Sequence, residues 1–260
     1  MEHVQKLINS EKQSIFKSAK IIKETSEKEL TTHSNSYFYK NVLDSKKIMD
    51  PTFFSTEIRQ FLDDEKNHLT KLFLKEQYEC IIEVGCHNGQ NAQWLSKLCA
   101  QYIGIDINKT AIDLAKRNQI PGKIEFFCTA VEDLNFLLLS DGKYPKRKVV
   151  LFPFNLFGNF INIEKLIAMF DMTGADIAMS HFNTKAATTV GRYDYYANCF
   201  GRSTVRVYDA EQGVLFKAGQ QFQSIAHSPD YLNKVIHDIS KYHGILMPFS
   251  FYGDLFLLTN

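Results

Sequence analysis

The chain has 260 residues, of which 45% are hydrophobic, enough for one large α/β domain with additions or for two small domains. Thirty basic residues against 29 acidic ones give a formal net charge of +1, so we expect no nucleic-acid partner. No apolar run approaches membrane-spanning length, so we expect no membrane association either. The five cysteines form no Cys-x-x-Cys pair and the eight histidines are scattered, which predicts no metal site and reduced thiols in a cytoplasmic protein.

Residues 1–75 precede any recognisable motif and form a predicted N-terminal helical extension. Residues 1–30 carry apolar side chains at helical spacing, and a second apolar helical face follows Asp50 and Pro51. Between them lies an aromatic loop with Tyr37 and Tyr39. Two interpretations stay open: the extension is a lid over a bound ligand, or it packs on the catalytic domain or on a partner subunit, as in a homodimer.

The best-defined stretch runs from residue 79 to residue 98. Residues 80–84 form a short, β-branched apolar run, typical of a strand buried on both faces. Gly85 and Gly89 bracket a tight turn, and the apolar residues from Ala92 onward fall at helical spacing. A strand, a glycine turn and a helix begin a nucleotide-binding α/β unit, in which backbone N–H groups at the turn face a ligand.

Strands and helices then alternate regularly, which predicts parallel strands joined by right-handed crossovers. The predicted strands are residues 102–107, 124–128, 148–152 and 175–180, and the predicted helices are residues 109–118, 131–139 and 163–170.

The pattern changes after the fifth strand. Residues 182–227 read as an insertion, with a helix over 185–200 and a hairpin turning at residues 209–213. A helix follows Ser228, and two strands over 244–249 and 254–258 form a final hairpin that adds an antiparallel strand to the parallel sheet. We expect the substrate to be recognised by the insertion.

The sequence Glu83-Val-Gly85-Cys-His87-Asn-Gly89 resembles the first motif of class I S-adenosylmethionine-dependent methyltransferases, although His87 occupies the usual middle glycine position. Some twenty residues later Asp106 ends the second strand, where the family binds the ribose hydroxyls; the alternative is that Asp106 caps the next helix. The resemblance covers residues 76–260. It implies a Rossmann-like, doubly wound sheet of seven strands in the order 3-2-1-4-5-7-6, with the last strand antiparallel and helices on both faces.

The resemblance also implies the cofactor S-adenosylmethionine and the residues that hold it. Ala130 stands where the family often has an acidic residue at the adenine, so the adenine is held by the backbone of Val131 or, after a small shift, by Glu132 or Asp133. The alternative is that these two acidic residues simply begin a helix. The predicted cofactor-binding residues are Glu83, Gly85, Cys86, His87, Asn88, Gly89, Asp106, Ile107, Ala130, Val131, Phe152 and Asn155.

The predicted substrate site lies beyond the end of strand four, because ligands of open α/β sheets bind outside the carboxyl ends of strands. Residues 191–199 resemble the substrate region of bacterial small-molecule methyltransferases. Tyr193 and Tyr196 share a helix face there, where they either wall a pocket or belong to the core. His181 is the candidate catalytic base, although a lone histidine is more often structural. The predicted substrate-binding residues are Tyr37, Tyr39, Asn155, His181, Tyr193 and Tyr196.

These patterns predict a methyltransferase that modifies a nitrogen or oxygen atom of a small molecule. Two other functions stay open. A non-catalytic module that binds S-adenosylmethionine would share the motifs, and only turnover would distinguish it. A nicotinamide-dependent oxidoreductase would share the fold, but the chain lacks the Gly-x-Gly-x-x-Gly fingerprint.

Overall fold

The computed structural model describes residues 38–39, 47–133, 145, 147–160, 163–171, 173–219, 222–239 and 241–259. The predicted helices within residues 1–30 and the candidate Tyr37 lie outside these ranges, as does most of the helix predicted over 131–139. Within the described ranges, no helix combines the length and the apolar character that crossing a bilayer requires.

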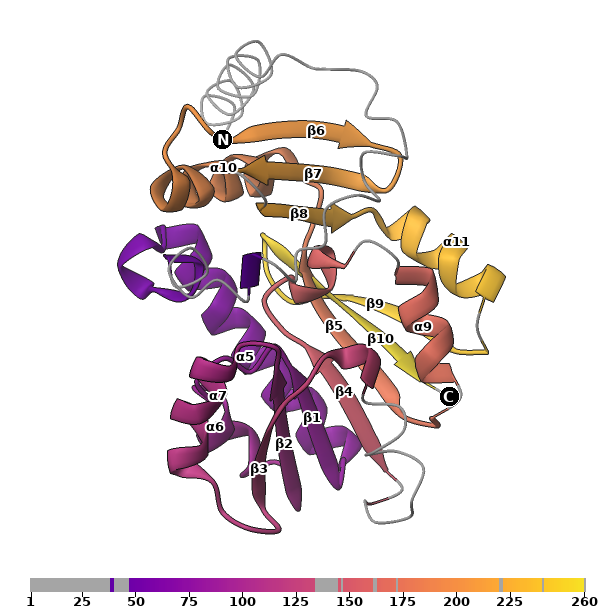
Figure 1. Cartoon of the computed structure of the whole chain (residues 1–260). Coiled ribbons are helices and arrows are strands. Elements are labelled where there is room, and N and C mark those ends of the chain that lie inside the picture. Colours follow the sequence, from indigo (N-terminus) through magenta and orange to yellow (C-terminus); the bar gives the residue numbers. More distant parts are fainter. Residues whose placement is uncertain are drawn as a thin grey trace.

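The described residues form a sheet of seven strands in the order β3-β2-β1-β4-β5-β10-β9 (Figure 1). The first five strands run parallel, and β10 runs antiparallel to both β5 and β9. This arrangement confirms the predicted sheet order, in which the last strand of the chain lies between the fifth strand and the last but one. The strands are β1 (Cys80–Val84), β2 (Gln101–Asp106), β3 (Ile124–Cys128), β4 (Lys148–Phe152), β5 (Asp176–Phe182), β9 (His243–Pro248) and β10 (Gly253–Thr259).

Helices cover both faces of this sheet, and their apolar residues form two separate clusters with it. On one face lie α5 (Thr56–Glu76), α6 (Ala92–Leu95) and α7 (Lys109–Ala115), which the 3-10 turn η2 (Lys116–Asn118) continues. On the other face lie α9 (Ile163–Asp171) and α11 (Pro229–Ile239). The helix predicted after the glycine turn is α6, which has only four residues, and β2 begins six residues after it ends.

The insertion after β5 folds as a helix and a small antiparallel sheet. They are α10 (Ala186–Phe200), β6 (Arg206–Ala210), β7 (Gly213–Ala218) and β8 (Phe222–His227), with the strands in the order β6-β7-β8. The predicted helix and hairpin are confirmed, whereas β8 was not predicted. Figure 1 shows the small sheet beyond one end of the large sheet, and residues of α10 and β8 share a third apolar cluster with α5.

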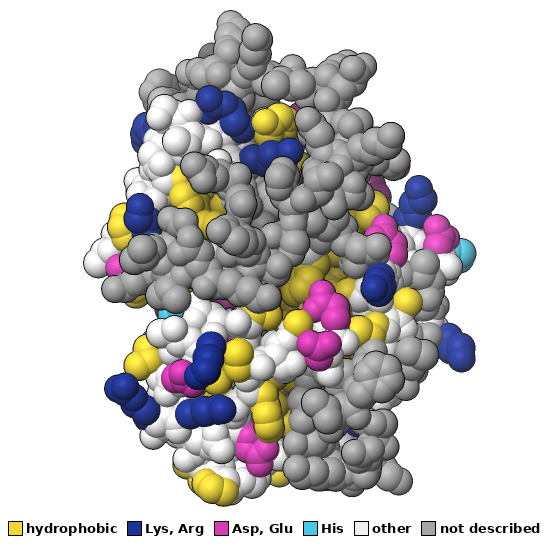
Figure 2. Space-filling model, in the orientation of Figure 1, with side chains coloured by type: hydrophobic (Ala, Val, Ile, Leu, Met, Phe, Trp, Pro, Cys, Tyr) yellow, Lys and Arg dark blue, Asp and Glu magenta, His cyan; other side chains and the backbone are white. Residues whose placement is uncertain are grey.

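The charged side chains that one view of the described residues shows (Figure 2) are of both signs, as in the composition. On the face shown in Figure 2, acidic and basic side chains are interspersed over the described part of the chain, and apolar side chains gather near its middle.

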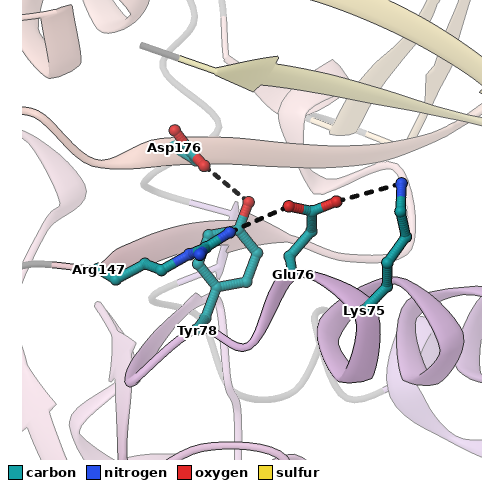
Figure 3. Close-up of polar contacts among 5 residues, drawn as sticks. All are labelled: Lys75, Glu76, Tyr78, Arg147 and Asp176. Carbon is teal, nitrogen blue, oxygen red and sulfur yellow. Dashed lines mark hydrogen bonds and ion pairs between the residues drawn. The ribbon is translucent and has the colours of Figure 1, made fainter.

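A polar network fixes the end of α5 against the amino ends of the parallel strands (Figure 3). The Tyr78 hydroxyl donates to Asp176 Oδ2 of β5 at 2.7 Å, and Arg147 pairs with Glu76 at 3.1 Å. The Arg147 guanidinium also lies over the Tyr78 ring, 5.7 Å from its centroid. The last turn of α5 is held by this network at the amino ends of the strands. Elsewhere α5 contacts α10, which in turn contacts the small sheet.

Candidate active site

A cavity of about 940 Å³ lies between the carboxyl ends of the parallel strands and the small sheet. Glu83 lines it from the end of β1, Asp106 from the end of β2, and Phe154 from the turn after β4. Phe222 and Ser224 of β8 line it from the opposite side. This is the place where open α/β sheets bind ligands, so the cavity is the candidate active site.

The turn after β1 has the left-handed backbone that its glycines predict. Gly85 has a φ of 69° and Gly89 a φ of 77°. A Cβ atom on Gly85 would come within 2.7 Å of Leu156 Cδ2, so this position also excludes a side chain by contact. His87 keeps the same kind of backbone, with a φ of 49°, although it has a side chain. The turn therefore retains the geometry of the glycine motif, and the His87 imidazole is added to the cavity lining.

The Glu83 carboxyl group is buried at the end of β1 and faces the cavity. Asn91 Nδ2 donates to its Oε1 at 2.7 Å, and the Tyr102 hydroxyl donates to its Oε2 at 2.5 Å. Burial raises the pKa of Glu83 to about 7, against the lowering effect of these two donors. A cation bound beside Glu83 would stabilise its ionised form, so the site is suited to a ligand with an amino group.

Asp106 connects the end of β2 to the turn after β1. Its Oδ2 accepts from the backbone N–H of His87 at 2.9 Å, and its Oδ1 accepts from that of Asn108 at 2.8 Å. The cap of α7 is Asn108, whose side chain accepts from Ala111 N at 3.1 Å. Burial raises the pKa of Asp106. Its carboxylate is thus fixed at the cavity wall, with lone pairs left for further donors.

The other predicted cofactor residues fall into two groups. Cys86, Ile107, Ala130 and Val131 line the cavity together with Glu132. Asn88, Gly89 and Phe152 do not line it. Phe152 is instead part of the core between β4 and α9, in edge contact with Phe170.

Asn155 lines the cavity, but its side chain joins the two sheets. Its Nδ2 donates to Ser224 Oγ at 3.0 Å and to Ile225 O at 3.1 Å, and its Oδ1 accepts from Phe182 N at 3.1 Å. Both amide hydrogens are therefore used within the protein. The backbone of Asn155 is left-handed, with a φ of 56°, a conformation that asparagine tolerates better than most residues.

The predicted substrate residues are also divided. Tyr39 lines the cavity, and its hydroxyl accepts from Asn159 Nδ2 at 2.7 Å. Tyr196 lines it from α10. Tyr193 lies outside the lining, with its hydroxyl 3.5 Å from the backbone oxygen of Arg202. His181 is buried in β5 away from the cavity, with Nδ1 3.0 Å from Phe182 O, and burial lowers its pKa.

Sequence reasoning missed two features of the site. The first is Glu65 of α5, a buried carboxyl group that lines the cavity. Its signal was available, because Glu65 falls four residues after Phe61 and four before Leu69, on the apolar face of the helix. The second is a wall of aromatic rings, which depends on contacts between distant segments. The rings that were not predicted are Phe54, Phe154, Phe182, Tyr195 and Phe222, which join the predicted Tyr196.

The comparisons with known proteins agree with this geometry. Residues 81–145, which include β2, β3, the turn after β1 and all of β1 except Cys80, match a family described as methyltransferase domain. A search of curated proteins finds no match.

Several solved structures share the fold. Magnesium protoporphyrin IX methyltransferase from Synechocystis PCC 6803, with bound SAM, is 10% identical over 92% of this chain and 99% of its own, with a TM-score of 0.53. The DhpI–SAM–HEP complex is 12% identical over 88% and 100% of the two chains, with a TM-score of 0.58. The plantazolicin methyltransferase BpumL, in complex with SAH, is 16% identical over 98% and 99%, with a TM-score of 0.55.

The matched domain contains the glycine turn and the acidic end of β2. The sheet order is the one expected from the resemblance of the sequence to class I methyltransferases. Residues 81–145 thus match a methyltransferase domain, and the chain shares its fold with solved structures that hold SAM or SAH.

Proposed function

We propose that S-adenosylmethionine lies across the turn 85–89, with its amino group beside Glu83 and its ribose hydroxyls at Asp106. The observation that carries this proposal is a pair of carboxyl groups at neighbouring strand ends, the buried Glu83 and the half-buried Asp106, on either side of a left-handed turn and in one cavity. Each carboxylate can accept from the donors that this cofactor offers, an ammonium group and a diol. Thr129, Ala130 and Val131 line the adjoining wall, where the adenine would lie.

We further propose that the methyl acceptor is a nitrogen or oxygen atom of a small molecule. The cavity continues from the proposed cofactor site to the aromatic wall, which the small sheet covers. A cavity that the small sheet covers on one side suits a molecule that can enter whole, and a net charge of +1 offers a nucleic acid little general attraction. The structural neighbours that methylate magnesium protoporphyrin IX and plantazolicin support this class of substrate.

The residues of the site would act mainly by positioning. A sulfonium is already activated for displacement of its methyl group, so the enzyme must hold the accepting atom in line at near-attack distance. The aromatic wall would exclude water and orient an apolar substrate, while the turn and the two carboxylates would hold the cofactor. Nitrogen and oxygen are the expected acceptors because each offers a lone pair for the attack.

The test is a methyl-transfer assay with S-adenosylmethionine labelled in its methyl group. The protein is incubated with small molecules that carry an amine, a phenol, an alcohol or a carboxylate, and with RNA and DNA as comparison substrates. We expect label in at least one nitrogen or oxygen of the small molecules, and at least a tenfold loss for Asp106→Ala. Label in nucleic acid alone, or S-adenosylhomocysteine binding with no transfer to any probe, would contradict the proposal.

A further inference from the structure

Glu65 is a buried carboxyl group that the cofactor site does not use. It belongs to the middle of α5, the residue is 6% exposed, and it lines the cavity. A glutamate costs free energy when it is buried, unless it is neutral or paired. Within the described residues, no basic side chain forms an ion pair with it. Its presence on the apolar face of α5 therefore calls for a function.

One oxygen of Glu65 is anchored by the protein. Oε1 accepts from the backbone N–H of Phe154 at 2.7 Å and from the Ser180 hydroxyl. Both bonds go to Oε1, and the described part of the chain supplies no donor to Oε2. Phe154 has a left-handed backbone, with a φ of 49°, so Glu65 also helps to hold the turn after β4 in an unusual conformation. The anchoring fixes the carboxyl group, and Oε2 remains available to a ligand.

The surroundings of Glu65 indicate what kind of ligand it would meet. Aromatic rings dominate this part of the lining: Phe54 and Tyr195 lie 5.8 Å apart between centroids, and Phe154 and Phe182 lie 5.9 Å apart. Ring faces attract cations, as does a carboxylate. Burial raises the pKa of Glu65 to about 7, and the Glu83 carboxylate adds to this effect. A cationic ligand would reverse that shift, whereas an anionic ligand would increase it.

We propose that Glu65 Oε2 binds the amino group of the methyl acceptor and takes its proton, so that the substrate is an amine with a flat apolar body. This inference rests on the proposed function and names the acceptor within it. The aromatic wall would hold the body of the substrate, and Glu65 would hold its head beside the methyl group.

The proposed step balances without a further reactant. The bound ammonium group first gives one proton to Glu65 Oε2, which leaves a neutral amine and a neutral carboxyl group. The lone pair of the amine then forms the new bond to the methyl carbon, while the carbon–sulfur bond breaks and its electron pair goes to the sulfur. The nitrogen takes over the positive charge that the sulfonium has lost, so the products are a methylated ammonium ion and S-adenosylhomocysteine. Release of the Glu65 proton to water restores the carboxylate.

The test uses three probes that share an aromatic body and differ in the charge of the head group: 2-phenylethylamine, 2-phenylethanol and phenylacetate. Their binding is measured by calorimetry on the protein saturated with S-adenosylhomocysteine, at pH 6 and pH 8. The variants are Glu65→Gln, which keeps an oxygen for Phe154 N and Ser180 but cannot be charged, and the control Ser180→Ala, which loosens the anchoring and keeps the charge.

We expect the wild type at pH 8 to bind the amine at least tenfold more tightly than the alcohol, and phenylacetate more weakly than either. This preference should shrink at pH 6, persist in Ser180→Ala and fall below threefold in Glu65→Gln. With labelled S-adenosylmethionine, transfer to the amine should rise with pH through about 7 in the wild type, and Glu65→Gln should lose this rise.

Equal binding of amine and alcohol by the wild type, including no binding of either, would overturn the inference. So would a preference that survives in Glu65→Gln, or a Glu65→Gln protein that loses S-adenosylhomocysteine instead, because Glu65 would then belong to the cofactor site. The pH comparison on the wild type applies even if a variant does not fold. A wild type that does not bind S-adenosylhomocysteine at all would contradict the proposed function itself.

Discussion

Replacing Asn155 by alanine should destabilise the protein by about 2–5 kcal/mol, because its side chain joins β5 to β8. The substitution leaves the buried N–H of Phe182 without its acceptor, and a stranded buried group costs about 1–3 kcal/mol. Alanine at a φ of 56° adds about 1–2 kcal/mol of backbone strain. The sum is a large part of the total stability of a typical domain, about 5–15 kcal/mol.

The assay is urea unfolding followed by circular dichroism, with Asn155→Gly as the matched control. Glycine tolerates the left-handed backbone, so Asn155→Gly should lose the hydrogen bonds and avoid the strain. We expect it to be more stable than Asn155→Ala by about 1 kcal/mol. Both variants should bind S-adenosylhomocysteine within threefold of the wild type when folded, because the amide hydrogens of Asn155 already have partners. An Asn155→Ala protein within 1 kcal/mol of the wild type would refute this account of the joint.

Three further predictions concern the cofactor end of the cavity. His87→Gly should keep the affinity for S-adenosylhomocysteine within threefold. It should leave the free energy of unfolding unchanged or up to about 1 kcal/mol higher, because the strain that glycine relieves at this left-handed position exceeds the entropy it costs. A tenfold weaker Kd would show that the imidazole binds the cofactor. Burial raises the pKa of Glu83 to about 7 from 4.5, so its contribution to stability is complete below about pH 4.5 and is lost as the pH rises to 7. Glu83→Gln should flatten this part of the stability–pH curve in urea unfolding, and an unchanged slope would count against the buried acid. Tyr39→Phe removes the hydroxyl that Asn159 donates to. We expect Tyr39 to help close the cavity over the cofactor, so this variant should lose about 0.5–1.5 kcal/mol of S-adenosylhomocysteine binding free energy. Calorimetry should show no change for the control Tyr193→Phe, because Tyr193 lies outside the lining.

The parts of the fold that were predicted correctly are those whose local pattern is decisive. Residues 80–84 are an apolar run followed by glycines in left-handed positions, and that combination has few other structural interpretations. The strand β8 was missed because Phe222–His227 has polar residues between its apolar ones, and all of them are buried between two layers. Only the packing of the small sheet on the large one buries both of its faces, and a single sequence does not show this packing.

The site was predictable to a similar degree. The turn and Asp106 lie close to each other because consecutive strands pair, so their place follows from the order of the strands. Glu65 enters the cavity from a helix that precedes the whole sheet, and its partner Ser180 lies 115 residues later. The charge of Glu65 on an apolar helix face was the one local signal. A shared helix face did not decide which of the two tyrosines lines the cavity: Tyr196 does, and Tyr193 does not.

The central claim is that S-adenosylmethionine binds across the turn 85–89, with Asp106 at its ribose. The most direct measurement is calorimetric titration with S-adenosylhomocysteine of the wild type, of Asp106→Ala and of the control Asp133→Ala, whose residue is exposed and outside the lining. We predict binding to the wild type, at least tenfold weaker binding to Asp106→Ala, equivalent to about 1.4 kcal/mol or more, and an unchanged Kd for Asp133→Ala. Circular dichroism shows whether Asp106→Ala is folded. No binding to the wild type, or equal binding to wild type and folded Asp106→Ala, would contradict the account.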